Sequence, residues 1–239
     1  MKNIEGKVRK ACEEYNLIET GDRITVAVSG GKDSMALLYA LSEFRNYSPK
    51  EFSLTVAVVD PQFNGIRTDY SLLEAFCNER NITIDIRRSN LAEVVFDTRN
   101  EKNPCSLCAR MRRGILHDMT IAAGCSKIAL GHHMNDAVET LFLNLFHQGR
   151  LESIKPKTYL SRKDITMIRP LLLCEEGEIT SYVTALSLPI VKSLCPKDGH
   201  SEREEIKKFI KEQEQKYVGF TKNTFFAMQR GNISELGYE

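Results

Sequence analysis

Residues 23–40 of this 239-residue chain carry the sequence RITVAVSGGKDSMALLYA, in which a short apolar run leads through paired glycines into a helical pattern. The β-branched run at 23–28 predicts a strand, and the apolar spacing that follows predicts a helix over about 34–44. Paired glycines let a backbone approach an anion, and a helix N-terminus presents free N–H groups and the positive end of its dipole. The stretch therefore predicts a loop that binds the phosphates of a nucleotide.

The side chains of this loop suit the same task. Lys32 adds a positive charge and the two serines add hydroxyl donors, while Asp33 either holds a Mg²⁺ ion or caps the helix. The Walker A pattern is absent, which argues against a kinase or GTPase of that type. A glycine turn that merely enters a helix is the alternative interpretation. The nucleotide-binding residues predicted here are Ser29, Gly30, Gly31, Lys32, Asp33 and Ser34.

The rest of the chain continues the alternation of strands and helices. We predict further strands at 54–59, 82–86, 127–130 and 167–169, and helices at 68–80, after Pro104, and at 135–147, 175–187 and 201–216. Repeated strand–helix–strand units predict an α/β fold, a doubly wound parallel sheet with helices on both faces. Residues 1–20 are expected to form a small helical N-terminal extension, followed by one domain over 21–239. The segments 97–103 and 149–164 break the pattern, and we expect both to be loops on the substrate side.

Composition limits the class of protein. With 42% hydrophobic and 27% charged residues the chain can bury a substantial core, and no apolar run reaches the roughly 18 residues needed to cross a bilayer. Because the polar start at 1–7 lacks the apolar core of a signal peptide, we expect a cytoplasmic protein with no membrane partner. The formal net charge of +1 lacks a strong basic excess, so any RNA contact depends on local patches.

Two of the seven cysteines form a CxxC motif at a predicted helix start, Asn103-Pro104-Cys105-Ser106-Leu107-Cys108. An N-cap and a proline at the first helical position precede the cysteines, whose spacing places both sulfurs on one helix face. A helix N-terminus should stabilise their thiolates, the form that binds metals or attacks electrophiles. Zinc or an iron–sulfur cluster usually needs three or four ligands, and Cys195 is the candidate for a third. Small buried hydrophobes are predicted at Cys12, Cys77, Cys125 and Cys174.

Polar residues also follow the ends of two other predicted strands. Asp60 ends the strand at 54–59, and Gly131-His132-His133 follows the strand at 127–130. The carboxyl edge of such a sheet is where ligands bind, so contacts to the nucleotide are assigned to Asp60, Gly131, His132 and Asp136. Fixing of the loop, or helix capping by Asn135 or Asp136, stays open as the alternative for this segment. No metal is assigned to either histidine.

Basic side chains gather on the helix after the CxxC motif and in the segment 149–164. They are Arg110, Arg112, Arg113, Lys155, Lys157, Arg162 and Lys163. Such residues either grip the phosphates of a nucleic acid or form a solvated helix face and loop, and the residues alone leave both open.

Taken together, these segments resemble the tRNA-cytidine 2-sulfurtransferase (TtcA-type) family of the PP-loop ATP pyrophosphatase superfamily, whose fold is adenine-nucleotide α-hydrolase-like. The similarity covers about residues 1–230. It rests on Gly21-Asp22-Arg23-Ile24 leading to the phosphate loop, residues 105–116, Gly131-His132-His133 through Asn144, and Ile168-Arg169-Pro170-Leu171. The chain departs from the family at Asn135, where Asp is usual, and near Cys195, where a second CxxC-like pair is usual. It is also shorter at its C-terminus than the longer members.

The resemblance implies an ATP-dependent tRNA thiolation with ATP, Mg²⁺ and a [4Fe–4S] cluster as cofactors. In that family two CxxC cysteines and one later cysteine hold the cluster and leave one iron without a protein ligand; here they map onto Cys105, Cys108 and Cys195. The C2 carbonyl oxygen of a cytidine in a tRNA anticodon loop would attack ATP, giving an O-adenylate and pyrophosphate. Sulfur on the open iron, or delivered as a persulfide, would then displace AMP and give 2-thiocytidine.

The expected partners are tRNA and a cysteine desulfurase or other sulfur donor, and a homodimer is left open. The resemblance favours RNA contacts by Arg110, Arg113, Lys155 and Lys157. Two alternatives remain. One is another adenylating enzyme of the PP-loop type, such as a lysidine-synthetase-like enzyme or a different thiolase. The other is a zinc-stabilised RNA-binding protein regulated by nucleotide.

Overall fold

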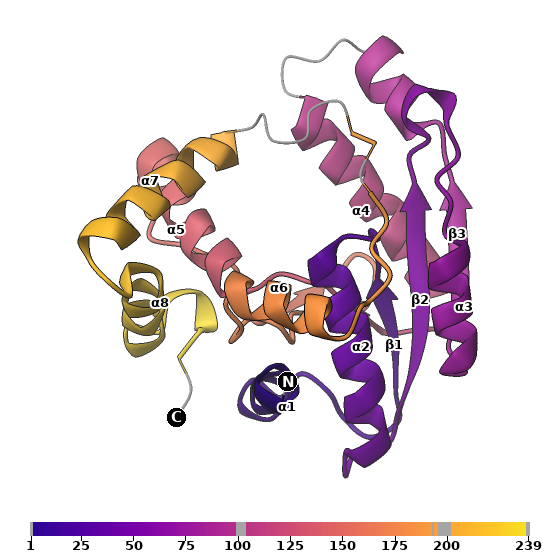
Figure 1. Cartoon of the computed structure of the whole chain (residues 1–239), viewed down its shortest axis with the longest axis horizontal. Helices are drawn as coiled ribbons and strands as arrows, with labels where there is room; N and C mark the ends of the chain where they lie inside the picture. The colour runs from indigo at the N-terminus through magenta and orange to yellow at the C-terminus, as the bar shows by residue number, and fades with distance from the viewer. Residues whose placement is uncertain (1, 99–103, 193, 196–201, 238–239) are drawn as a thin grey trace.

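A six-stranded, mostly parallel sheet is the framework of the fold, and its labelled strands lie side by side in Figure 1. The computed structural model describes residues 2–98, 104–192, 194–195 and 202–237. Along the sheet the strand order is β3-β2-β1-β4-β6-β5. Only β5 runs antiparallel to its neighbour within these residues. The strands are β1 (Asp22–Ala27), β2 (Phe52–Asp60), β3 (Thr83–Arg88), β4 (Lys127–Ala129), β5 (Lys157–Leu160) and β6 (Ile165–Ile168).

Helices connect and cover these strands. They are α1 (Lys2–Glu14), α2 (Lys32–Tyr47), α3 (Ser71–Glu79), α4 (Pro104–Ala122), α5 (Met134–Gln148), α6 (Glu176–Ala185), α7 (Glu202–Lys216) and α8 (Phe220–Arg230). Short helical turns are η1 (Phe63–Gly65), η2 (a π-helix, Glu93–Thr98) and η3 (Ile233–Glu235). Within the described ranges, no helix has the length and apolar character needed to span a bilayer.

Side chains of β2 alternate between two buried layers. Val56 and Val58 enter the main core with α2, whereas Ala57 and Val59 contact Met119 of α4 on the other face. Burial on both faces explains the continuous apolar run of this strand, which is usual in parallel sheets. After β3 the chain crosses to the other side of β1, where β4 pairs with it. The connection that follows β1 leads toward β2 and the connection that follows β4 leads toward β6, so the two connections diverge at the carboxyl edge. Ligands of open α/β sheets bind at such a switch point.

The N-terminal helix belongs to the main core. Ile4, Val8 and Ala11 of α1 are buried in the same cluster as Leu37 and Leu41 of α2. Lys7 also forms a 2.6 Å ion pair with Glu178 on α6. The predicted helix at 1–20 is therefore present, and the division into residues 1–20 and 21–239 stays a prediction.

The fold class is confirmed, and two of the predicted elements need correction. The segment 149–164 is not a loop throughout, because β5 at its centre pairs with β6. Helix α8 was not predicted at all, because Thr and Asn interrupt its apolar pattern. Of the other predicted loop, 97–103, residues 97 and 98 end the π-helix η2, and residues 99–103 lie outside the described part of the chain.

Candidate functional site

The phosphate loop joins β1 to α2 at the carboxyl edge of the sheet, as predicted. Gly31 is the N-cap of α2, with φ −74° and ψ 163°, and Gly30 has φ +88°. The Ser34 hydroxyl donates to the Gly31 carbonyl at 2.8 Å and accepts the Ser29 N–H at 3.2 Å. These bonds fold the loop around the start of the helix, where backbone N–H groups face an anion. Of the two alternatives for Asp33, helix capping is not observed, because Gly31 is the N-cap, and Mg²⁺ binding stays a prediction.

Two glycines allow neighbouring segments to come close to this loop. A Cβ on Gly30 would lie 2.6 Å from the Cβ of Val191, whose N–H donates to the Gly30 carbonyl at 3.0 Å. A Cβ on Gly131 would lie 3.2 Å from the backbone carbonyl carbon and oxygen of Asp33. Residues 190–192 therefore cross the phosphate loop on one side, and Gly131 packs directly against its other side.

Lys32 is held at the loop by two carboxylates. Its Nζ donates to Asp33 Oδ1 at 2.8 Å and to Glu176 Oε1 at 2.9 Å. Burial alone lowers the pKa of Lys32, but the hydrogen bonds with Asp33 and Glu176 outweigh it, so the pKa is raised. The side chain stays protonated and one-third exposed, ready to meet phosphate oxygens. Glu176 was not singled out from the sequence, where Glu175 to Glu178 signal only a helix start.

The segment after β4 fixes the relative positions of three helices. The His133 N–H donates to Asp136 Oδ2 at 3.0 Å, and His133 Nε2 lies 3.7 Å from Asp33 Oδ1. Asn135 Oδ1 accepts the Glu176 N–H at 2.9 Å, which ties the start of α5 to the start of α6. Capping and loop fixing, left open from the sequence, are thus present at Asn135 and Asp136. A nucleotide contact by Asp136 stays a prediction.

His132 lies in the same segment and is partly buried. Burial lowers the pKa of His132 to about 4, so the imidazole is neutral near pH 7. Its Nδ1 is buried and has no hydrogen-bond partner among the described residues. A neutral ring with an unpaired nitrogen can donate or accept a hydrogen bond with a bound molecule. The predicted contact between His132 and the nucleotide therefore stays a prediction.

A buried carboxylate lies one helical turn beyond Asp136. The Glu139 side chain is 4% exposed, and its Oε2 lies 3.6 Å from Arg203 Nε on α7. Arg203 Nη1 also lies 3.2 Å from Asp136 Oδ1. Burial, and then the charge of Asp136, raise the pKa of Glu139 to about 7. Neither Glu139 nor Arg203 was predicted from the sequence. The available signal was the spacing of Asp136 and Glu139, two acids three residues apart on one predicted helix.

A cavity of about 360 Å³ opens beside the phosphate loop. Ser29 and Gly31 of the loop and Arg112 of α4 line it, and most of the other lining residues are apolar. The apolar walls include Val59, Phe63, Ile190 and Val191. An apolar slot next to a phosphate-binding loop suits the flat base of a nucleotide.

Asp60 supports the rim of this cavity. Its side chain is fully buried at the end of β2. The carboxylate accepts the Gln62 N–H at 3.2 Å, the Thr68 N–H at 3.2 Å and the Thr68 hydroxyl at 3.1 Å. Asp60 thereby closes the turn after β2, and its predicted nucleotide contact stays a prediction.

The three candidate ligand cysteines influence one another electrostatically. Helix α4 begins at Pro104 as predicted, and Cys108 is buried against Leu91 and Val95. Burial raises the pKa of the Cys108 thiol, nearby Arg112 opposes this, and the charges of Cys195 and Cys105 raise the pKa further. The structure thus brings Cys195 to the start of α4. Burial opposes the predicted stabilisation of the Cys108 thiolate by the helix N-terminus, which stays a prediction.

The remaining cysteines are all buried, as predicted; they are Cys12, Cys77, Cys125 and Cys174. Where the structure describes the chain, no set of three or more His, Cys, Asp or Glu side chains is arranged to hold a single metal ion.

The four candidate RNA-binding residues fall into two separate pairs. Arg110 and Arg113 are exposed on α4, near the cysteines. Lys155 forms an ion pair with Glu235, and Lys157 Nζ donates to the Asn16 carbonyl at 3.0 Å. The second pair is therefore anchored to the ends of this chain. Contacts between these residues and RNA stay predictions.

Comparison with known proteins gives consistent matches. The PP-loop domain family model matches residues 1–213. A tRNA-cytidine(32) 2-sulfurtransferase of Syntrophotalea carbinolica is 39% identical over 212 residues, which cover 87% of this chain and 81% of that protein. One from Dechloromonas aromatica is 37% identical over 237 residues, 98% of this chain and 82% of that protein. The structure of the U34-tRNA thiolase NcsA from Methanococcus maripaludis, with its [4Fe-4S] cluster, matches with a TM-score of 0.77 at 27% identity, covering 96% of this chain and 76% of that one.

Proposed function

Because this chain belongs to the PP-loop family of tRNA-cytidine 2-sulfurtransferases, we propose that it uses ATP to convert a cytidine of a tRNA anticodon loop to 2-thiocytidine. One observation carries the proposal. The wall of the cavity beside the phosphate loop includes Arg112, one helical turn from Cys108, and Leu194, the neighbour of Cys195. A nucleotide in this cavity would therefore lie next to the three cysteines, where an activated base can meet a sulfur.

The first step is adenylation. The C2 carbonyl oxygen of cytidine attacks the α-phosphorus of ATP, the bond from that phosphorus to the bridging oxygen breaks, and pyrophosphate leaves. Backbone N–H groups of the loop and the Nζ of Lys32 bind the phosphates and stabilise the charge that develops on pyrophosphate. Asp33, a one-third-exposed carboxylate at the loop, offers the oxygen ligand that Mg²⁺ prefers, and the ion enters with ATP.

The cysteine set fits a [4Fe–4S] cluster. Each thiolate of such a cluster binds a different iron, so three cysteines need to surround a cluster rather than one point. Cys105 and Cys108 lie one turn apart on α4, Cys195 approaches from another segment, and Leu91 and Val95 supply an apolar surround. When bound, the cluster would supply an iron without a protein ligand, at which sulfide would be available as the nucleophile that displaces AMP from C2.

We further propose a cytoplasmic reaction in which Arg110 and Arg113 contact the RNA backbone beside the cysteines. Sulfur comes from a cysteine desulfurase or another donor. Assembly into a homodimer is part of the same proposal.

The decisive experiment combines metal analysis with product analysis. Protein purified without oxygen is assayed for iron and acid-labile sulfide, then incubated with ATP, Mg²⁺, sulfide and unmodified tRNA. We expect about four irons and four sulfides per chain, release of AMP and pyrophosphate, and 2-thiocytidine in nuclease digests analysed by mass spectrometry. Cys105→Ser and Cys195→Ser should lose both iron and product, whereas Cys125→Ser, a change at a cysteine outside the set, should keep both.

Two results would contradict the proposal. Stoichiometric zinc, with no pyrophosphate released for any tRNA, would favour an RNA-binding protein. Pyrophosphate release with lysine incorporated, and no dependence on the three cysteines, would favour a lysidine-synthetase-like enzyme.

A further inference from the structure

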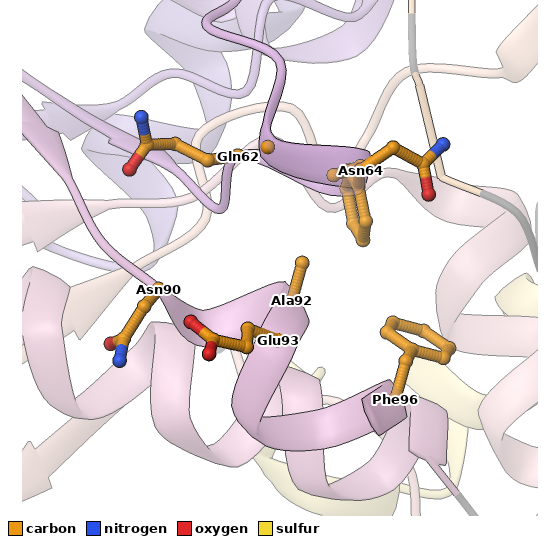
Figure 2. A pocket seen from close by; sticks show the side chains of 8 residues that line it. Gln62, Asn64, Asn90, Ala92, Glu93 and Phe96 are labelled. Carbon is orange, nitrogen blue, oxygen red and sulfur yellow. The ribbon is translucent and has the colours of Figure 1, made fainter. Parts of the chain in front are cut away.

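A second, larger cavity adjoins the nucleotide cavity. It has a volume of about 520 Å³ and lies between the turn η1 after β2 and residues 90–96 after β3 (Figure 2). Phe63 belongs to the walls of both cavities. Neither ATP nor the cysteines, as placed above, occupies this space.

The lining of this cavity combines polar and aromatic side chains. Figure 2 shows the polar ends of Gln62, Asn90 and Glu93 toward one side, and the ring of Phe96 with the amide of Asn64 toward the other. Phe96 and Phe63 contact each other edge to face, with ring centroids 6.0 Å apart. An aromatic face combined with a hydrogen-bonding edge is the arrangement with which proteins bind an unpaired base of RNA.

The turn that carries the upper wall is built with unusual backbone conformations. Gln62 and Asn64 both have φ 54°, and Gly65 has φ 70°. Asparagine tolerates this region, but glutamine does so at a cost, and such positions concentrate at ligand sites. The buried carboxylate of Asp60 holds the turn through the Gln62 N–H. The backbone of the turn therefore sets the direction in which the Gln62 and Asn64 side chains leave the chain.

The cavity also adjoins the sites of both reacting partners. Phe63 lines it together with the nucleotide cavity, and Phe96 packs in the same hydrophobic cluster as Cys108. A base held against Phe96 would therefore lie close to the nucleotide and to the cysteine site.

We propose that this cavity binds the cytosine that is to be thiolated, and that Glu93 makes the site prefer cytosine to uracil. The inference rests on the proposed function for the class of substrate. Cytosine presents an exocyclic amino group, which can donate a hydrogen bond to a carboxylate. Uracil presents a carbonyl oxygen at the same position, which a carboxylate repels. The amides of Gln62 and Asn90 can donate to the ring nitrogen and carbonyl, and Phe96 offers a face for stacking. A volume of about 520 Å³ is adequate for a base and its ribose.

Selectivity is tested by RNA binding without ATP. Two anticodon stem-loops that carry either cytidine or uridine at the modified position are titrated against wild type, Glu93→Gln and the control Glu74→Gln, an exposed carboxylate on α3. We expect wild type and Glu74→Gln to prefer cytidine by about tenfold or more, and Glu93→Gln to lose most of this preference, because an amide can pair with either base. A preference unchanged in Glu93→Gln would overturn the inference.

Stacking is tested by steady-state kinetics. Phe96→Leu keeps apolar volume but loses the ring, so KM for the cytidine stem-loop should rise about tenfold while KM for ATP stays constant. Phe96→Tyr should restore KM for RNA. If Phe96→Leu instead raises KM for ATP, the cavity belongs to the nucleotide and the inference is wrong. If wild type forms 2-thiocytidine, but substitutions at positions 93 and 96 change neither the preference for cytidine nor KM for the stem-loop, the inference fails and the proposed function stands. If wild type releases no pyrophosphate with any RNA, the proposed function fails and this inference with it.

Discussion

Replacing Gly30 by alanine should destabilise the protein strongly, whereas the same change at the adjacent Gly31 should not. At Gly30 the backbone has φ +88°, where a Cβ costs roughly 1–2 kcal/mol. The new Cβ would also lie 2.6 Å from the Cβ of Val191, and overpacking of this kind typically costs about 1–3 kcal/mol. Together these effects predict a loss of about 2–5 kcal/mol for Gly30→Ala. Gly31 has φ −74°, and a Cβ there would meet only Ser29 Oγ at 3.4 Å, so its loss should stay below about 1 kcal/mol.

Urea unfolding followed by circular dichroism, without ATP, measures both losses. Because the steric part depends on Val191, Gly30→Ala should cost less in a Val191→Gly background than in wild type, although the φ penalty remains. Equal losses for the two alanine variants, or the same cost of Gly30→Ala in both backgrounds, would refute the reasoning.

Three further changes probe other parts of the site and fold. Lys32→Met removes charge-assisted bonds worth about 1.5–3 kcal/mol each, so KM for ATP should rise about 10- to 100-fold; an unchanged KM would exclude a phosphate contact. Burial raises the pKa of Glu139 in the folded state to about 7 from its ordinary 4.5, so folding takes up a proton between pH 4.5 and 7. Glu139 therefore lowers the free energy of unfolding as the pH rises through this range. Thermal unfolding should therefore show Glu139→Gln gaining on wild type from about pH 4.5 to 7, and parallel pH curves would contradict this. Lys127 forms a 2.6 Å buried ion pair with Asp22, so Lys127→Met should lower the free energy of unfolding in urea by about 3 kcal/mol, because it leaves the Asp22 carboxylate buried without its partner. Adding Asp22→Asn should restore part of this loss. A double variant whose loss equals the sum of the two single losses would contradict the reasoning.

Local signals explain what could be predicted from the sequence. The unit from β1 to α2 combines a short β-branched run, paired glycines and helical spacing within residues 22–47, and the structure has all three where they were expected. The start of α4 at Pro104 was likewise predicted from the proline ahead of Cys105. Cys195 was chosen as a third candidate ligand because it follows a predicted strand end and precedes a polar turn, and its role at an iron–sulfur cluster came from the resemblance to a family.

The parts that were missed depend on tertiary contacts or on an exposed edge. Glu176 meets Lys32 across 144 residues, and Arg203 meets Asp136 across 67, separations at which no periodicity gives a signal. Strand β5 was predicted as loop because its exposed side of the sheet edge carries Lys157 and Tyr159, residues that also suit a solvated loop. Edge strands use charged side chains to avoid pairing with other chains, so their sequences look less strand-like.

The segment that crosses the phosphate loop is continuous with the segment that carries the third cysteine. Val191 is held to Gly30, residues 190–192 line the nucleotide cavity, and Cys195 follows three residues later. A nucleotide in the cavity and a group bound at Cys195 would therefore both act on the same short stretch of backbone. By thermodynamic linkage, any free energy by which bound ATP favours one position of this segment must appear, with equal size, in the affinity of the cysteine site for its own ligand. The change in ATP affinity when the group at Cys195 is removed should accordingly equal the change in affinity for that group when ATP is removed.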